Sequence, residues 1–372
     1  MELVNSLFHH FWSFVVVLSV IVFIHEFGHY IIAKICGVKI EAFSIGFGRE
    51  LFGRTDRSGT RWKFSILPLG GYVKMYGDAS EASNADADAL DAMTDEQKKL
   101  TFHHKPLYKK AAIVAAGPVF NFILTIGVLT WFIMTTGLAS VEPLVGGVLP
   151  GSPAEQAGLQ IGDRIERVND AKMRSFNDIP YTISTNLEKP VTLQVLRGGE
   201  RLTLTLTPQI MEEPDGLGNS VKIPRIGIKS KDIRYEEVGL PAALGEATRR
   251  TYLICASTLQ VMGQMITGKR DVDELKGPVG IAQLSGQATE KDFYTVLWLI
   301  AMLSANLGLV NLLPIPMLDG GHLMFYLVEA LRGRPLATKV QEWGFRFGTA
   351  MLVMLMTFTL FNDVRQQLEK VL

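Results

Sequence analysis

The sequence predicts an α-helical polytopic membrane protein with about four transmembrane helices and an inserted water-exposed module. Of its 372 residues, 48% are hydrophobic and 20% are charged, a combination that indicates membrane segments joined to a soluble part. The apolar residues concentrate in four runs, each close to the roughly 20 residues that a helix needs to cross a bilayer. These runs lie at about 11–35, 111–138, 293–313 and 343–361.

Basic residues indicate how these helices are oriented. Clusters of Lys and Arg follow the first run, precede the second, and separate the third from the fourth. Under the positive-inside rule these segments are cytoplasmic, which places both termini and the region around 140–290 on the opposite side. A signal peptide is an alternative interpretation of the first run, but no Lys or Arg precedes it and no small-residue cleavage site follows it.

Composition also restricts the partners and the metal ligands. Lys and Arg together number 37, as do Asp and Glu, so charge gives no indication of nucleic-acid binding. The two cysteines, Cys36 and Cys255, are too few for a Cys-rich zinc finger. Any metal must therefore be held by His and carboxylates.

Two segments between the helices favour β-structure. The run at about 62–76, WKFSILPLGGYVKMY, has apolar and aromatic residues around a Pro-Leu-Gly-Gly turn, which predicts a membrane-associated β-hairpin. Aromatic residues would also suit a simple interfacial anchor. Short β-like runs separated by Gly, Pro and Asn turns then occupy 141–208, within a predicted domain at 139–230.

The run GSPAEQAGLQIGD at 151–163, followed by RIERVND, resembles the PDZ domains of bacterial proteases. PDZ domains bind extended peptides by adding a strand to a sheet edge, so this inserted α+β domain is expected to bind a peptide in its groove. The alternative is a small β-domain that only spaces the helices.

The segment 231–292 is expected to contain an interfacial amphipathic helix and a connector. Apolar residues in 241–268 could occupy one helical face, with Glu246, Arg249 and Arg250 away from it. Charges in its first half favour a helix lying on the membrane lipid over a fifth span.

The first hydrophobic run contains His25-Glu26-Phe27-Gly28-His29, an HExxH motif. Two His four residues apart share one helix face and can bind a single zinc ion, while Glu26 can act as the general base. Ionisable residues within a transmembrane run are costly and are functional by default. The alternative is a structural polar cluster in the bundle.

A catalytic zinc requires a third protein ligand, and Asp319 is the best candidate. It lies in the segment NLLPIPMLDGGH at the end of the third run, where Pro314 and Pro316 break the helix. Gly320 and Gly321 are expected to let the backbone turn sharply. Broken backbone at membrane depth is tolerated where protein buries it or where it lines a wet cavity. His322 is a weaker ligand candidate and is expected to orient other groups.

With both motifs and the PDZ module in place, the chain resembles the site-2 protease family of intramembrane zinc metalloproteases. It is most similar to the bacterial regulator of sigma-E protease (RseP) group, over nearly the whole chain. The resemblance implies a Zn²⁺ cofactor held by His25, His29 and Asp319, with Glu26 as the general base. It departs from the best-known members in having room for one PDZ domain where they carry two.

The resemblance also implies how substrate binds. Asn311 would lie near the scissile carbonyl, and Asn121, in Gly117-Pro-Val-Phe-Asn121, would bind the unwound substrate. The segment Lys276-Gly-Pro-Val-Gly-Ile281 matches a further family motif. The hairpin, through Gly70, Gly71 and Tyr72, would pair with substrate as an added strand.

The resulting hypothesis is a zinc metalloendopeptidase that performs site-2 cleavage of single-span membrane proteins. Its substrates, such as anti-sigma factors or remnant signal peptides, would first be cut by another protease. The expected location is the bacterial inner membrane, with the PDZ domain periplasmic and the active site toward the cytoplasm. The expected division of the chain is 1–138 and 293–372 for the membrane domain, with 139–292 between. A membrane-tethered PDZ adaptor and a metal-ion transporter are the competing hypotheses.

Overall fold

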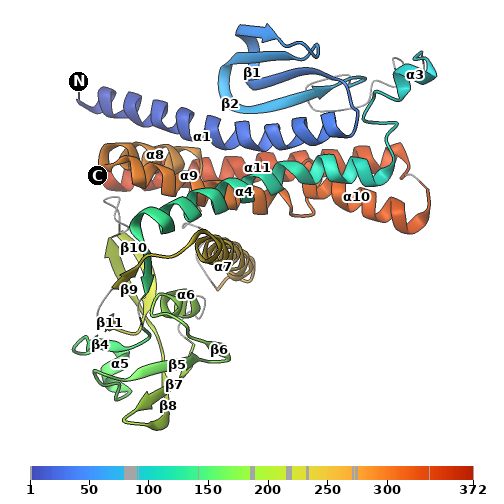
Figure 1. Ribbon diagram of the computed structural model, residues 1–372. Helices are drawn as coiled ribbons and strands as arrows, with labels where there is room; N and C mark the ends of the chain where they lie inside the picture. The colour runs from blue at the N-terminus through green and yellow to red at the C-terminus, as the bar shows by residue number, and fades with distance from the viewer. Residues whose placement is uncertain are drawn as a thin grey trace. The chain divides into compact units, whose positions relative to one another are not determined.

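The computed structural model describes residues 2–78, 90, 92–140, 142–184, 189–214, 220–231, 234–269, 272, 275–334 and 336–371. The chain divides into two compact units, each with its own internal contacts. The first joins Met1–Val128 to Asp273–Leu372, and the second is Leu129–Val272. Figure 1 shows the elements of both units, coloured along the chain.

Four helices in the described part of the chain are long and apolar enough to cross a membrane, which confirms the predicted number of spans. Three of them extend beyond the predicted apolar runs at one or both ends, because a helix can extend past the bilayer with polar residues at its ends. On the last of the four, Trp343, Phe347 and Phe361 are each 66–70% exposed. Such a surface suits contact with lipid and not with water. The four helices are α1 (Glu2–Ile35), α4 (Leu107–Thr136), α9 (Phe293–Asn311) and α11 (Thr338–Val371).

The β-hairpin of the first unit is larger than the sequence analysis predicted. It consists of β1 (Ile40–Thr55) and β2 (Arg61–Met75), whereas the expected range 62–76 covers only β2. Both strands pack on α1 through a core that includes Tyr30 and Phe43 (Figure 1). The expected range was too short because the partner strand comes from residues that precede it in the sequence.

Pairing within this hairpin places one segment at the sheet edge. The segment 40–45 pairs with 71–75 on one side and with 61–65 on the other, and 61–65 pairs in turn with 50–55. The two halves of β2 therefore lie on opposite sides of the segment 40–45 and do not form a hairpin with each other. Among the described residues, 71–75 has no partner strand on its outer side.

The last long helix also stabilises the first unit at its C-terminal end. Asp363 of α11 is 2% exposed, and its carboxylate accepts hydrogen bonds from the backbone N–H groups of Gly277, Val279 and Gly280 at 3.0 Å. These groups open α8 (Pro278–Lys291) and belong to the motif noted at 276–281. A carboxylate is favourable there because the first N–H groups of a helix have no partner within it. Among the described residues, the other helices of this unit are α3 (Asp95–Lys98) and α10 (Asp319–Arg332).

The second unit contains the predicted PDZ domain. Its main sheet has the strand order β6-β5-β7-β8, and its core is a cluster of apolar side chains that includes Ile165, Leu193 and Val195, all 0% exposed. The elements of this domain are β4 (Val145–Val148), α5 (Pro153–Gln156), β5 (Arg164–Val168), β6 (Ala171–Lys172), α6 (Asp178–Ser184), β7 (Val191–Arg197), β8 (Glu200–Leu206) and β11 (Ile228–Ser230). The unit also contains β3 (Leu138–Ser140), β9 (Gln209–Pro214), β10 (Ser220–Arg225) and β12 (Arg234–Glu236).

The Gly162-Asp163 turn of the PDZ motif has a specific structural role. Gly162 has a φ of +95°, which an L side chain rarely adopts. The next residue, Asp163, is 1% exposed and accepts two hydrogen bonds of 2.7 Å from the guanidinium of Arg197. It also accepts one of 2.9 Å from the backbone N–H of Gln160. The Gly-Asp pair therefore links this turn to the end of β7.

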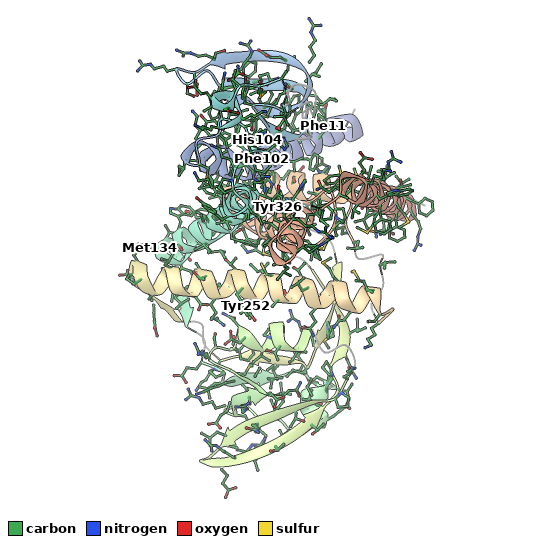
Figure 2. The ribbon with its side chains drawn as sticks, turned by 90° about the vertical axis from the view of Figure 1, so that its right-hand side faces the viewer. Phe11, Phe102, His104, Met134, Tyr252 and Tyr326 are labelled. Carbon is green, nitrogen blue, oxygen red and sulfur yellow. The ribbon has the colours of Figure 1, made fainter. Side chains whose placement is uncertain are left out.

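A single long helix, α7 (Leu240–Ile266), follows the PDZ domain in the second unit. Ala243, Ala247 and Ile254 are buried on one face, and Arg249 forms an ion pair with Asp178 of α6 at 2.8 Å. Several other apolar side chains of this helix are exposed. Tyr252 (71%, labelled in Figure 2) and Ile266 (84%) are examples. The helix matches the predicted amphipathic segment 241–268, and it is not among the four helices suited to span a membrane.

Candidate metal centre

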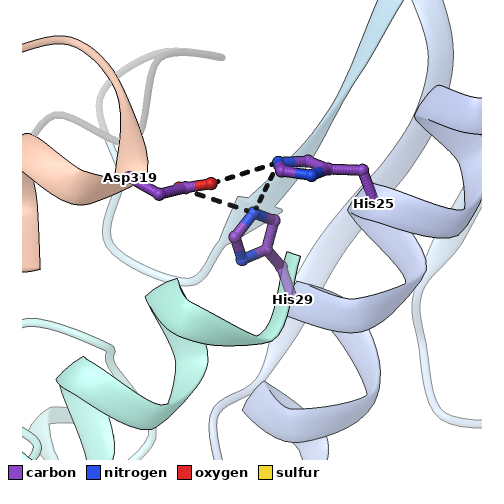
Figure 3. A group of neighbouring side chains, drawn as sticks. All are labelled: His25, His29 and Asp319. Atoms are coloured by element: carbon purple, nitrogen blue, oxygen red, sulfur yellow. Dashed lines mark hydrogen bonds and ion pairs between the residues drawn. The ribbon is translucent and has the colours of Figure 1, made fainter. Parts of the chain in front are cut away.

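Both histidines of the HExxH motif lie on α1 and direct one ring nitrogen toward the same point. His25 and His29 are one helical turn apart, and their Nε2 atoms are 3.2 Å from each other (Figure 3). Their side chains are 9% and 14% exposed. The spacing of four residues therefore produces the shared face that the sequence predicted.

Asp319 lies beside the two histidines because the third long helix ends before this residue is reached. The helix α9 stops at Asn311, a non-helical segment follows, and α10 begins at Asp319 itself. One carboxylate oxygen lies 3.2 Å from His25 Nε2, and the other lies 3.6 Å from His29 Nε2 (Figure 3). The prediction that these three residues come together is confirmed.

The two glycines after Asp319 act differently from the expected sharp turn. Neither has a positive φ. A Cβ atom on Gly320 would lie 2.2 Å from the carbonyl oxygen of Leu313, and one on Gly321 would lie 2.4 Å from that of Ile315. Glycine is needed because the first turn of α10 packs directly against the preceding backbone, and that contact fixes the position of Asp319.

The spacing of these three side chains fits a zinc ion. Among the described residues, His25, His29 and Asp319 form a group of potential ligand atoms within 4.8 Å of one another. Nitrogen or oxygen ligands about 2.0–2.1 Å from a tetrahedral zinc lie roughly 3.3–3.4 Å apart. The two Nε2 atoms, 3.2 Å apart, are close to this value, and the two different oxygens of Asp319 lie 3.2 Å from His25 Nε2 and 3.6 Å from His29 Nε2. These three residues would hold the zinc ion and would leave a fourth position for water, as catalytic zinc sites require.

The second long helix, α4, contacts both histidines at their Nδ1 atoms. Nδ1 of His29 donates to the carbonyl oxygen of Ile113 at 2.8 Å, which fixes the proton on Nδ1 and leaves Nε2 free to bind a metal. Nδ1 of His25 faces the amide nitrogen of Asn121 at 3.1 Å. Gly117 lies between Ile113 and Asn121 along α4, and a Cβ atom there would be 2.3 Å from His29 Nε2.

A cavity of about 520 Å³ opens on the metal ligands. Glu26, the expected general base, lines this cavity with all three ligands. Gly71 and Tyr72 line it from the edge strand 71–75, as do Val73 and Met75. The other lining residues are Phe102, His103, Lys110, Ile113, Val114, Asn311, Met317, Leu318, His322, Phe325, Tyr326, Glu329, Gln341 and Phe345.

The residues expected to bind substrate divide into two groups. Asn311 lines the cavity, with its amide nitrogen 3.5 Å from His25 Nε2, and Gly71 and Tyr72 line it as well. Gly70 does not line the cavity and instead packs against the ring of Phe47. Asn121 is fully buried and contacts His25, and its expected role in holding substrate stays a prediction.

His322 lies in the cavity wall but outside the ligand group. Its ring is 5.3 Å from that of Phe345 and 6.5 Å from that of Tyr326. Among the described residues His322 is not part of the group of potential ligand atoms, and its expected orienting role stays a prediction.

Sequence reasoning missed two contributions to this centre. It noted Gly117 as part of a motif without recognising that the histidines need its missing side chain. It also missed the carbonyl of Ile113, because a sequence does not show which backbone groups will contact a given side chain. A Gly-Pro pair inside an apolar helix was the available signal, since Gly inside a helix carries a cost and often has a packing or functional reason.

The second unit has a separate groove of about 220 Å³. It lies between α6 and the chain that enters β11, where Phe176, Ile179 and Ile183 face Ile226 and Ile228. Its other lining residues are Leu149, Pro180, Met211, Pro224, Arg225 and Gly227. An apolar groove beside a short strand is the arrangement that PDZ domains use for peptides.

The chain matches a known protein family and has similar relatives. A family model described as peptidase family M50 matches residues 13–355. A provisionally named zinc metalloprotease of Rhizobium meliloti, R01501, is 42% identical over 356 residues, which are 95% of this chain and 95% of that protein. Metalloprotease MmpA of Caulobacter vibrioides is 37% identical over 377 residues and also covers 95% of each chain. Among solved structures, the PDZ domain of the SdrC-like protein of Listeria monocytogenes matches 25% of this chain and 88% of its own, with 20% identity and a TM-score of 0.20.

Proposed function

Because the chain belongs to peptidase family M50, whose members are zinc metalloproteases, we propose that it hydrolyses peptide bonds of single-span membrane proteins within the bilayer. The observation that carries this proposal is the position of His25, Glu26 and His29 on a helix apolar enough to span a membrane, with Asp319 beside them. Three ionisable residues on such a helix would be costly without a function. A soluble peptidase would not need them there.

The side chains at this centre supply the parts of a hydrolysis reaction. When bound, zinc provides Lewis acidity that acidifies water and polarises the carbonyl of the peptide bond. Glu26 takes the proton from the attacking water and delivers it to the nitrogen of the leaving amine as the peptide bond breaks. The amide of Asn311, beside the metal ligands, donates to the oxyanion that develops on the carbonyl.

The sheet edge in the cavity supports a way of presenting substrate. A helical peptide bond is protected by its own hydrogen bonds, so a transmembrane substrate must unwind before it is cut. Its freed N–H and C=O groups then need partners within the membrane. The segment 71–75 is a sheet edge that lines the cavity, and an unwound substrate could add to it as a further strand.

Cleavage of a model single-span substrate by the purified protein in detergent tests this function. Wild type should give product that a zinc chelator abolishes, and Glu26→Gln should be slower by about 10²–10⁴-fold while it retains zinc. Equal cleavage by Glu26→Gln would contradict the mechanism. Zinc-loaded wild type without product on any single-span substrate would favour the adaptor hypothesis.

The natural substrates are proposed to be membrane proteins already shortened by another protease, such as anti-sigma factors or remnant signal peptides. The apolar lining of the PDZ groove suits the apolar end that such a cut exposes. Substitution of Ile226, which is 2% exposed in this groove, by Asp should weaken binding of apolar C-terminal peptides. Unchanged peptide affinity would show that the groove is not the binding site.

The location proposed for the chain is the bacterial inner membrane, with the PDZ domain periplasmic and the metal centre toward the cytoplasm. The helix α7 is proposed to lie on the membrane surface, because its exposed apolar side chains would otherwise face water. In a cysteine-free background, Glu200→Cys should react with an impermeant maleimide in intact spheroplasts, whereas Arg57→Cys should require permeabilisation. The reverse pattern would invert the topology.

A further inference from the structure

The side chain of Asn121 is a buried polar group that the reaction itself does not use. It lies on α4, is 0% exposed, and directs its amide nitrogen at His25 Nδ1 across 3.1 Å. Its amide oxygen is buried and has no hydrogen-bond partner among the described residues. A buried acceptor without a donor is unfavourable, so this orientation of the amide leaves one of its two ends unsatisfied.

The two orientations of this amide have opposite consequences for His25. A neutral imidazole carries its proton on one nitrogen and accepts through the other. If the amide nitrogen of Asn121 donates to Nδ1, the proton of His25 is on Nε2, and Nε2 cannot bind a metal. If the amide is turned by half a rotation, its oxygen accepts the proton of Nδ1, and the lone pair of Nε2 is free.

His29 provides an internal comparison. Its Nδ1 contacts a backbone carbonyl, which can only accept, so its tautomer is already the one that binds metal. His25 has no such carbonyl and depends on an amide that can either donate or accept. Both contacts come from α4. The backbone of Asn121 is held by Thr125 and Ser304, whose hydroxyls each donate to its oxygen at 3.0 Å.

We propose that Asn121 is a positioning residue whose amide oxygen accepts the Nδ1 proton of His25 and thereby sets the tautomer in which His25 binds zinc. The proposal rests on the metal centre and not on the identity of the substrate. It predicts that an acceptor at this position is sufficient and that the amide nitrogen is dispensable. Groups that orient metal ligands in this way typically contribute about 10–100-fold to metal affinity.

Zinc affinity, measured by competition with a chromophoric chelator on the purified full-length protein in detergent, tests this role without substrate. Asn121→Leu removes the acceptor at similar volume and should bind zinc about 10–100-fold more weakly. Asn121→Asp keeps an acceptor oxygen and should bind within a few-fold of wild type. The matched control is Thr130→Val on the same helix, whose buried hydroxyl has no partner among the described residues, and it should leave the affinity unchanged.

Two outcomes would overturn the proposal. Unchanged affinity in Asn121→Leu would show that His25 needs no acceptor, and an equal loss in Asn121→Asp would show that the donor nitrogen matters. A failure of proteolysis in an assay with substrate would leave these results intact, because zinc affinity is measured on its own.

A measurement on wild type avoids any effect of substitution on folding. In protein labelled with ¹⁵N-histidine and loaded with zinc, Nδ1 of His25 should carry a directly bonded proton, seen as a one-bond N–H coupling. The resonance is identified by its loss in His25→Gln. A bare Nδ1 in zinc-loaded wild type would contradict the proposal.

Discussion

The core of the PDZ domain consists of apolar side chains with almost no exposed surface, whereas the metal centre is surrounded by glycines and buried polar groups. In the PDZ domain, Leu193 and Val195 are fully buried among other aliphatic residues. At the metal centre, Gly117 and Gly320 allow backbone and ligands to approach closely, and Asn121 contacts a ligand directly.

This difference reflects the surroundings of the two regions. A water-exposed domain gains stability by removing apolar surface from water. Helices in a bilayer gain nothing from that source, so close packing at small residues and hydrogen bonds hold them together. The metal centre should therefore be sensitive to added volume and the PDZ domain to lost volume. Three predictions test this contrast.

The largest expected effect is on the PDZ core. Leu193→Ala should destabilise the domain by about 2–5 kcal/mol, because it removes buried methyl groups and leaves a cavity. Hydrogen exchange of peptides from 191–206 in the full-length protein would measure the change. Zinc affinity should be unaffected, and Thr203→Ala on an exposed position of β8 should change exchange little. A parallel loss of zinc affinity would show that the two units do not respond independently.

A smaller effect is expected at Gly117, where the substitution adds volume instead of removing it. Its Cβ atom in Gly117→Ala would lie 2.3 Å from Nε2 of His29 and 2.7 Å from Cε1 of His25, so the ligands must move. Zinc affinity should fall by about 10–100-fold, as for other changes beside metal ligands, and exchange in the PDZ domain should not change.

The same helix provides a matched control for this substitution. A Cβ atom on Gly127 would meet no atom within 4 Å, and Ala favours a helix over Gly. Gly127→Ala should therefore bind zinc as wild type does. If both variants lose zinc equally, the close approach at Gly117 is not the cause.

The sequence predicted the metal ligands well because their chemistry imposes fixed spacing. Two His at i and i+4 must share a helix face, and the charge pattern around the helices placed Asp319 at the same depth. The edge position of 71–75 could not be predicted from the residue pattern itself, because it depends on pairing with 40–45 across a long stretch of chain. A sequence pattern of period two identifies a strand but not its neighbours.

The role of Asn121 was not predictable for a related reason. Its motif was recognised, but the direction of its side chain depends on how α4 is rotated against α1. That rotation is set by contacts such as Gly28 against the backbone of Ala116, where a Cβ atom would lie 2.5 Å from the carbonyl oxygen. Close contacts between helices depend on both partners, so neither helix alone indicates which face is buried.

The smallest expected effect is the response of the PDZ domain to acid. Burial alone would raise the pKa of Asp163, but the guanidinium of Arg197 and the backbone N–H of Gln160 outweigh it and hold the pKa below its ordinary value. A carboxyl with a lowered folded-state pKa stabilises the domain above the unfolded pKa, which is about 3.9 for Asp. That contribution is lost as the pH falls below this value toward the folded pKa.

Hydrogen exchange of the segment 191–206 in the full-length protein, corrected for the intrinsic exchange rate, should therefore be steady from pH 7 to pH 5 and accelerate below about pH 4. Asp163→Asn cannot titrate, so its protection should be lower at neutral pH and should change less with acid. If wild type and variant respond equally to acid, other carboxyl groups determine the response. The Gly-Asp turn would then stabilise the domain through its backbone conformation and not through the charge of Asp163.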